Sequence, residues 1–199
     1  MKPAILTALL ALAPIADART IANFEFSEVI PETQSHPEMA LNGAAIRTMY
    51  YLVDAYVGLM YVENPSDDPD YLITQDTHKR VVYHILVNRV SGRRIASAMY
   101  DAMQLNLSEQ EAAALSDRLD QLVTMFDSKM ERGDVGYVEY IPGKGSKVVI
   151  KGEEKGIIPG KDLFDALMKI WIGEYPVTHK FKRGILGLDH SEEQITTVD

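Results

Sequence analysis

The sequence contains no cysteine among its 199 residues. Disulfide bonds, thiolate metal sites, a cysteine nucleophile and a lipid anchor on an N-terminal cysteine are therefore excluded. A protein without disulfides has to be stabilised by its hydrophobic core. Roughly 180 residues remain after a short leader, and that length suits one domain with a sizeable core.

Long apolar runs and an excess of positive charge are also missing. The N-terminal apolar run, residues 4–13, is too short for a transmembrane helix, and no later segment approaches the roughly 20 residues that a bilayer requires. We therefore predict no stable membrane insertion. The formal net charge is -9, which argues against nucleic acid and anionic membrane surfaces as partners.

The first 18 residues have the layout of a secretory signal peptide. Lys2 supplies the positive start, residues 4–13 form the apolar run, and Ala16-Asp17-Ala18 fits the small-x-small cleavage pattern, with cleavage after Ala16 as a second option. A buried amphipathic helix is disfavoured because the run has no polar face. We therefore expect a signal peptide over 1–18, a domain over 19–190, a flexible tail over 191–199, and a periplasmic or secreted protein.

Hydrophobic periodicity predicts an α+β order of elements. Ser108 and Glu111 have the spacing of a capping box at the start of the second helix, and Gly133 is expected to end that helix. Strand patterns cover 20–29, 41–63, 79–87, 135–141, 146–150 and 155–158, and helical patterns cover 95–105, 108–130, 162–172 and 178–186.

Common motifs for cofactors and metals are missing as well. Gly143-Lys144-Gly145-Ser146 lacks the full G-x-x-x-x-G-K-[ST] pattern and joins two predicted strands, so it indicates a hairpin turn. No G-x-S-x-G elbow is present, and no two of the five histidines are spaced as metal ligands. We predict no metal and no other cofactor.

The most informative segment is 41–63, LNGAAIRTMYYLVDAYVGLMYVE, which reads as one bent strand or two strands. Arg47 stands near its start. A guanidinium keeps its charge, so a buried one needs an anion as partner. That partner is either a carboxylate of the protein, with Asp54 and Glu63 nearby in the sequence, or the anionic group of a ligand. If the pleat is unbroken, Arg47 shares a face with Met49, Tyr51, Val53, Ala55, Val57, Leu59 and Tyr61.

Three pieces of the sequence together resemble the chalcone isomerase-like family, specifically its bacterial exported branch. They are LNGAAIRTMYY followed by YVGLMYVE, the strand pair whose turn runs through Gly152, Lys155 and Gly156, and LMKIWIGEYPVTHKFKRGILG near the C-terminus. The resemblance implies an open-faced β-sandwich, in which helices pack on one side of a large antiparallel sheet and an apolar cleft lies between them.

The resemblance also implies site residues. The family's plant enzymes cyclise chalcones to flavanones with an arginine that steadies the phenolate and the enolate, and its fatty-acid-binding members use that arginine for a carboxylate. It corresponds to Arg47 here. The enzymes' threonine on the second strand falls at Tyr56, and Thr178 matches a C-terminal polar residue. The tyrosine and asparagine of these enzymes fall near Ser91 and Ala98, so most of the residues that accompany the arginine in catalysis are replaced in this sequence.

Three hypotheses follow. The leading one is an exported, non-catalytic domain that binds a small apolar anion, such as a fatty acid, through Arg47, Tyr56 and Thr178. The second is an intramolecular lyase of the chalcone isomerase type, acting on a phenolic or enone substrate with the same three residues. The third is a periplasmic structural or partner-binding protein in which Arg47 is paired internally. A closed apolar cavity beside Arg47, with no protein carboxylate within reach, would favour the first.

Export is directly testable. N-terminal sequencing of the mature protein from a secreting host should start near Arg19 or Asp17, because the small residues Ala16 and Ala18 mark the two cleavage options. A mature cytoplasmic protein that retains Met1 would refute the assignment.

Overall fold

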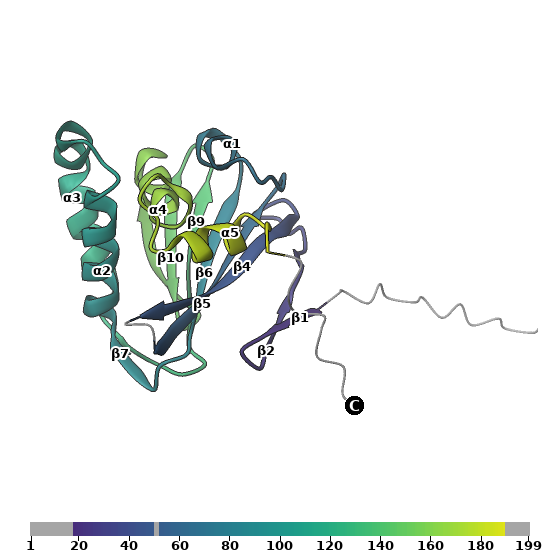
Figure 1. The fold of residues 1–199 in the computed structure, drawn as a ribbon. Helices are drawn as coiled ribbons and strands as arrows, with labels where there is room; N and C mark the ends of the chain where they lie inside the picture. The colour runs from purple at the N-terminus through teal and green to yellow at the C-terminus, as the bar shows by residue number, and fades with distance from the viewer. Residues whose placement is uncertain (1–17, 50–51, 190–199) are drawn as a thin grey trace, which may run out of the picture.

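The computed structural model describes residues 18–49 and 52–189 (Figure 1). The expected tail and, except for Ala18, the expected signal peptide lie outside these residues. The helices are α1 (Pro69–Thr74), α2 (Gly92–Gln104), α3 (Glu109–Met125), α4 (Asp162–Ile172) and α5 (His179–Ile185). The strands are β1 (Ala18–Ile21), β2 (Phe24–Ser27), β3 (Val29–Ile30), β4 (Met39–Met49), β5 (Val53–Val62), β6 (Lys79–Ile85), β7 (Arg89–Ser91), β8 (Lys129–Glu131), β9 (Val135–Ile141), β10 (Gly145–Ile150) and β11 (Glu153–Ile158).

A seven-stranded antiparallel sheet forms the centre of the fold. Its strand order is β11-β10-β9-β6-β5-β4-β3, so each strand pairs with a sequence neighbour except at the β6–β9 contact. The chain between β6 and β9 carries α2, α3 and the small β7–β8 pair before it returns to the sheet (Figure 1). The predicted α+β fold with a large antiparallel sheet is confirmed.

The helices pack on one face of this sheet, as expected (Figure 1). Leu119 of α3, Phe164 of α4 and Phe181 of α5 are buried in one cluster with Met60 and Val138 of the sheet. Helix α4 is the central helix of this layer, because it contacts each of the other helices as well as β10. It buries apolar side chains around much of its circumference, as expected for a helix covered on several sides.

The opposite face of the sheet is covered in part by the β1–β2 hairpin. Phe24 and Phe26 pack on His84, with ring centroids 4.0 and 5.5 Å from the histidine ring. The expectation of a single strand over 20–29 was wrong, because Ala22 and Asn23 adopt positive φ angles of 51° and 67° and reverse the chain in a tight turn. The edge strands of the main sheet are β11 and the short β3, which begins at Val29, the last residue of that segment.

Helix α3 starts as predicted and ends earlier than predicted. The capping box of Ser108 and Glu111 is present. The helix stops at Met125, and Met130 belongs to β8, so Gly133 does not end it. The prediction failed because Phe126 and Met130 lie outside any helix but are almost fully buried. As apolar residues they extend the helical pattern of the sequence beyond the true end of α3.

Two negative findings apply to the described part of the chain. No helix there is long and apolar enough to cross a membrane. No group of three or more histidine, aspartate or glutamate side chains there could hold a metal ion.

Because Lys79 is buried, we expect the free energy of unfolding to depend on pH in the alkaline range. Its ammonium donates to the carbonyl oxygens of Ile73 and Gln75 at 3.1 and 2.6 Å, and burial lowers its pKa from 10.5 to about 8. Between these values the folded state releases the proton before the unfolded state does, so the free energy of unfolding should rise with pH. Urea unfolding from pH 7.5 to 9.5 should show this rise in the wild type relative to Lys79→Met; equal slopes would contradict it.

Candidate functional site

The β4–β5 hairpin places Arg47 directly opposite Tyr56. The chain reverses between Met49 and Val53, so the strand is not unbroken. Tyr56 and Met60 pack towards the helices, whereas Val57, Leu59 and Tyr61 belong to the cluster on the other face. The expected face of Arg47 was therefore wrong: as the cross-strand partner of Tyr56, it lies on the helix-covered face.

A β-bulge adjoins this pair. The register passes from Arg47 opposite Tyr56 to Thr48 opposite Asp54, which leaves Ala55 without a cross-strand partner in β4. Bulges twist the strand locally and are common beside functional sites, where they re-aim a side chain. Here the bulge lies between the Arg47–Tyr56 pair and the last two pairs of the hairpin, Thr48–Asp54 and Met49–Val53.

Arg47 has no carboxylate partner among the described residues. It is partly buried, and its Nη1 donates to the carbonyl oxygen of Thr48 at 2.8 Å. The two carboxylates near it in the sequence are engaged elsewhere. Asp54 accepts from the hydroxyl of Thr48 at 2.7 Å, and Glu63 accepts from the backbone N–H of His78 at 2.6 Å. The ion pair that the third hypothesis requires, with Asp54 or Glu63, is not formed.

The hydroxyl of Tyr56 accepts a hydrogen bond from Nε1 of Trp171 at 3.2 Å. Its own proton has no acceptor among the described residues, so the phenol can donate to an incoming anion. Burial raises the pKa of Tyr56 to about 12, although the charge of Arg47 acts in the opposite direction. Tyr56 is therefore a neutral donor at physiological pH.

Two aromatic side chains from the helix layer hold Tyr56 in place. The rings of Trp171 and Phe181 lie 6.3 and 5.9 Å from the ring of Tyr56, and 5.3 Å from each other. Gly58 makes this packing possible, because a Cβ there would lie 2.5 Å from Cζ of Phe181. Trp171 is the only tryptophan of the chain. In the sequence, Trp171 stands out only by this rarity and by its place in the motif LMKIWIGEYPVTHKFKRGILG.

Thr178 contributes to this site only through the helix that it caps. It is exposed and is the N-cap of α5, where its hydroxyl accepts from the backbone N–H of Phe181 at 3.1 Å. It thereby orients the helix whose Phe181 packs on Tyr56. The two positions where the family's enzymes carry a tyrosine and an asparagine have no matching polar role: Ser91 caps α2 and Ala98 is exposed on that helix.

Tyr83 adds a polar atom to the interior between sheet and helices. It lies on β6 opposite Gly58, stacks on Phe126 and is 4 % exposed. Its hydroxyl has no hydrogen-bond partner among the described residues, and burial raises its pKa. A buried hydroxyl without a partner is uncommon, and sequence analysis did not single it out.

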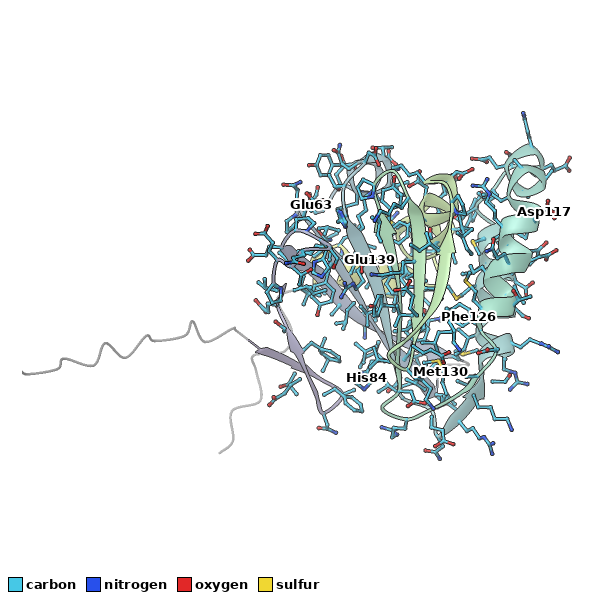
Figure 2. All side chains as sticks on the ribbon, turned by 180° about the vertical axis from the view of Figure 1, so that it is seen from behind. Glu63, His84, Asp117, Phe126, Met130 and Glu139 are labelled. Carbon is cyan, nitrogen blue, oxygen red and sulfur yellow. The ribbon has the colours of Figure 1, made fainter. Side chains whose placement is uncertain are left out.

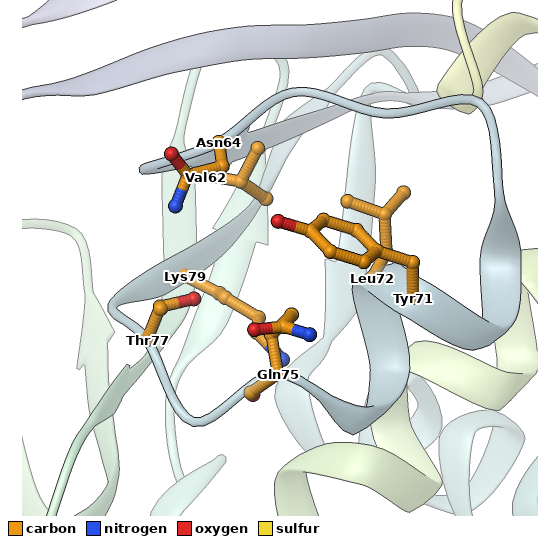
Figure 3. Close-up of a pocket in the computed structure, with 7 residues that line it drawn as sticks. All are labelled: Val62, Asn64, Tyr71, Leu72, Gln75, Thr77 and Lys79. Carbon is orange, nitrogen blue, oxygen red and sulfur yellow. The ribbon is translucent and has the colours of Figure 1, made fainter.

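Two hollows stand out on the described structure, and Arg47 lines neither of them. The hollow beside α1 has no room for a water molecule, and its lining side chains are Val62, Asn64, Tyr71, Leu72, Gln75, Thr77 and Lys79 (Figure 3). The other, of about 470 Å³, is an open hollow between the start of α2 and the end of α3. Trp171 and Phe181 occupy the space next to Tyr56, so a ligand chain entering there would have to displace them.

Comparison with known proteins agrees with this architecture. A family model described as chalcone isomerase-like matches residues 18–187. The chain belongs to this family. The crystal structure of an Arabidopsis thaliana fatty-acid binding protein is similar, with a TM-score of 0.69 and 17 % identity over 85 % of this chain and 96 % of that one. At this identity the likeness shows the shared fold alone. No curated protein matches the chain in sequence.

A second arginine of the same sheet, Arg80, forms an ion pair with a carboxylate of the protein. On the face opposite the helices, Nε and Nη2 of Arg80 donate to Oε2 of Glu139 at 3.0 and 2.6 Å, and Lys147 lies 3.4 Å from the same oxygen. Glu139 is fully buried, and Figure 2 labels its position on the sheet. Arg80 is therefore structural, and it provides a control for Arg47.

The two arginines should respond differently to replacement by methionine. Arg47→Met should change the free energy of unfolding by less than about 1.5 kcal/mol, because no described carboxylate loses its partner. Arg80→Met should cost about 3–5 kcal/mol, because it removes both guanidinium bonds of a buried carboxylate. Urea unfolding of both variants measures this; a large loss for Arg47→Met would return Arg47 to a structural role.

Proposed function

We propose that this chalcone isomerase-like protein is exported, is not an enzyme, and binds a small apolar anion such as a fatty acid at Arg47 and Tyr56. One observation carries the proposal: a charged guanidinium lies opposite a neutral phenol with a free proton, and no described carboxylate pairs with it. A carboxylate can accept from both groups, and a guanidinium fork matches its geometry.

The surroundings suit an apolar ligand chain. Trp171 and Phe181 border the phenol, and the interior behind them is the main apolar cluster of the protein. The unpartnered hydroxyl of Tyr83 lies in the same layer. We propose that the chain of the ligand enters between sheet and helices by displacing Phe181, whose short helix α5 is anchored at its start by Thr178.

Catalysis is less well supported than binding. General acid–base catalysis is most effective when the pKa of the group lies near the working pH, and the pKa of Tyr56 is about 12. Ser91 and Ala98 supply no replacement for the enzymes' tyrosine and asparagine. The likeness to a fatty-acid binding protein agrees with binding, although it extends to the fold only.

Laurate and dodecanol, ligands of equal chain length with and without a charge, test the proposal. Calorimetric titration should show that the wild type binds laurate more tightly than dodecanol. Arg47→Met should weaken laurate binding by about 2 kcal/mol or more, the scale of a lost charge-assisted pair, and Tyr56→Phe by about 1 kcal/mol. The control is Tyr61→Phe, whose hydroxyl bonds the carbonyl oxygen of Ser27 on the other face; its affinity should be unchanged.

Two outcomes would overturn this proposal. One is the absence of laurate binding to the folded wild type. The other is cyclisation of a chalcone well above the spontaneous rate, followed by absorbance, that is lost in Arg47→Met. The second outcome would promote the intramolecular lyase hypothesis.

A further inference from the structure

The end of the molecule that carries Arg47 also exposes an apolar tip. Four large apolar side chains at the end of the β4–β5 hairpin are accessible to solvent: Leu52 is 89 % exposed, Val53 46 %, Met49 38 % and Ile46 36 %. We call these four residues the hairpin tip. Exposed apolar side chains that gather at one place, rather than singly, commonly mark an interaction site.

A cluster of positive side chains lies on the segments next to the hairpin tip. Its members, here named the basic cluster, are exposed and form no ion pair with any described carboxylate; they are Arg89, Arg93, Arg94, Lys129 and Arg132. Three acidic residues stand near them. Asp127 and Asp134 are already paired with Lys155 and Lys151, each at 3.1 Å, which leaves Glu131 as the unmatched acid of these segments.

Such a local excess of basic side chains is unusual for this acidic protein. The basic cluster holds a quarter of its 20 lysines and arginines, although the chain has 29 acidic residues and a net charge of -9. Charges farther away than about 8–10 Å are largely screened at physiological ionic strength. The local cluster, rather than the net charge, therefore governs what approaches this end.

The hairpin tip and the basic cluster lie at the same end of the sheet. The backbone N–H of Leu86 donates to the carbonyl oxygen of Ala55 at 2.9 Å. Val53 precedes Ala55 by two residues and Arg89 follows Leu86 by three, and because β5 and β6 are antiparallel both segments leave the sheet in the same direction. Figure 1 shows the end of β4 and the start of β5 at the same end of the sheet as β7, and Figure 2 shows Met130 of β8 at the opposite end from Glu63.

We propose that this end of the protein docks on the surface of an anionic phospholipid bilayer. The hairpin tip enters the boundary between headgroups and acyl chains, while the basic cluster contacts phosphate groups. A membrane surface offers both chemistries at once, and apolar insertion combined with Lys and Arg contacts is the general mode of peripheral membrane binding.

Docking also gives the site a source of ligand, a point that rests on the proposed function. Arg47 is two residues from Met49 of the hairpin tip. In the docked protein Arg47 lies near headgroup level, where the carboxylate of a membrane-dissolved fatty acid is found. The surface itself does not depend on any ligand, so laurate titration without vesicles and vesicle binding without laurate succeed or fail separately.

Vesicle co-sedimentation tests the docking surface. The wild type should bind vesicles of phosphatidylglycerol and phosphatidylcholine in a 3:7 ratio, bind pure phosphatidylcholine far less, and dissociate as salt rises. Arg93→Gln should lower the partition coefficient about fivefold, the weight of one basic residue near such a surface. Lys144→Gln is its control, because this exposed lysine lies in the β9–β10 turn at the other end of the sheet.

Leu52→Ser isolates the apolar contribution and should lower the partition coefficient at least fivefold without changing the unfolding curve, since the side chain is almost free of packing. Leu105→Ser is the control, because Leu105 is 69 % exposed at the far end of α2 from the basic cluster. Two results would overturn the proposal. One is equal binding of anionic and neutral vesicles. The other is concentration-dependent self-association that Leu52→Ser abolishes, which would assign the hairpin tip to a second copy of the chain.

Discussion

The site depends on one constraint: a side chain that keeps its positive charge is fixed on the covered face of a sheet without a negative partner from the described protein. Backbone pairing fixes Arg47 opposite Tyr56, and Trp171 and Phe181 hold the phenol. Each of these contacts has a structural cause, such as the reversal of the chain in the β4–β5 hairpin or the absence of a side chain at Gly58. No described carboxylate compensates the positive charge of Arg47.

The opposite face of the same sheet shows that the fold can compensate a cation when the residues allow it. Arg80 shares the buried carboxylate of Glu139 with Lys147. There the acid lies on the neighbouring strand, directly across from the arginine. At Arg47 the residue across is a tyrosine instead, and the nearest acid along the hairpin, Asp54, bonds Thr48. The contrast within one sheet supports the proposed role of Arg47 in ligand binding over a role in stability.

Sequence analysis located Arg47 and the family resemblance because both rest on local patterns: one charge in an apolar strand, and short motifs in a fixed order. The face of Arg47 was predicted wrongly because alternation holds only while the strand continues, and the hairpin between Met49 and Val53 reset it. The end of α3 was wrong because buried Phe126 and Met130 imitated a helical stripe. The contacts of Trp171, Tyr83 and Glu139 join distant segments, and one sequence carries no signal for such pairings.

Binding and catalysis make different demands on the same arginine. A binding site needs charges that keep their state, whereas acid–base catalysis needs a group that gains or loses a proton during the reaction. A guanidinium is permanently charged, and burial raises the pKa of Tyr56 to about 12, so this phenol keeps its proton. Neither group is therefore suited to take up or release a proton in a chemical step. A fixed positive charge can stabilise a bound anion or one that develops during a reaction. Since neither Arg47 nor Tyr56 is suited to proton transfer, these two groups support the proposed retention of an anion better than its conversion.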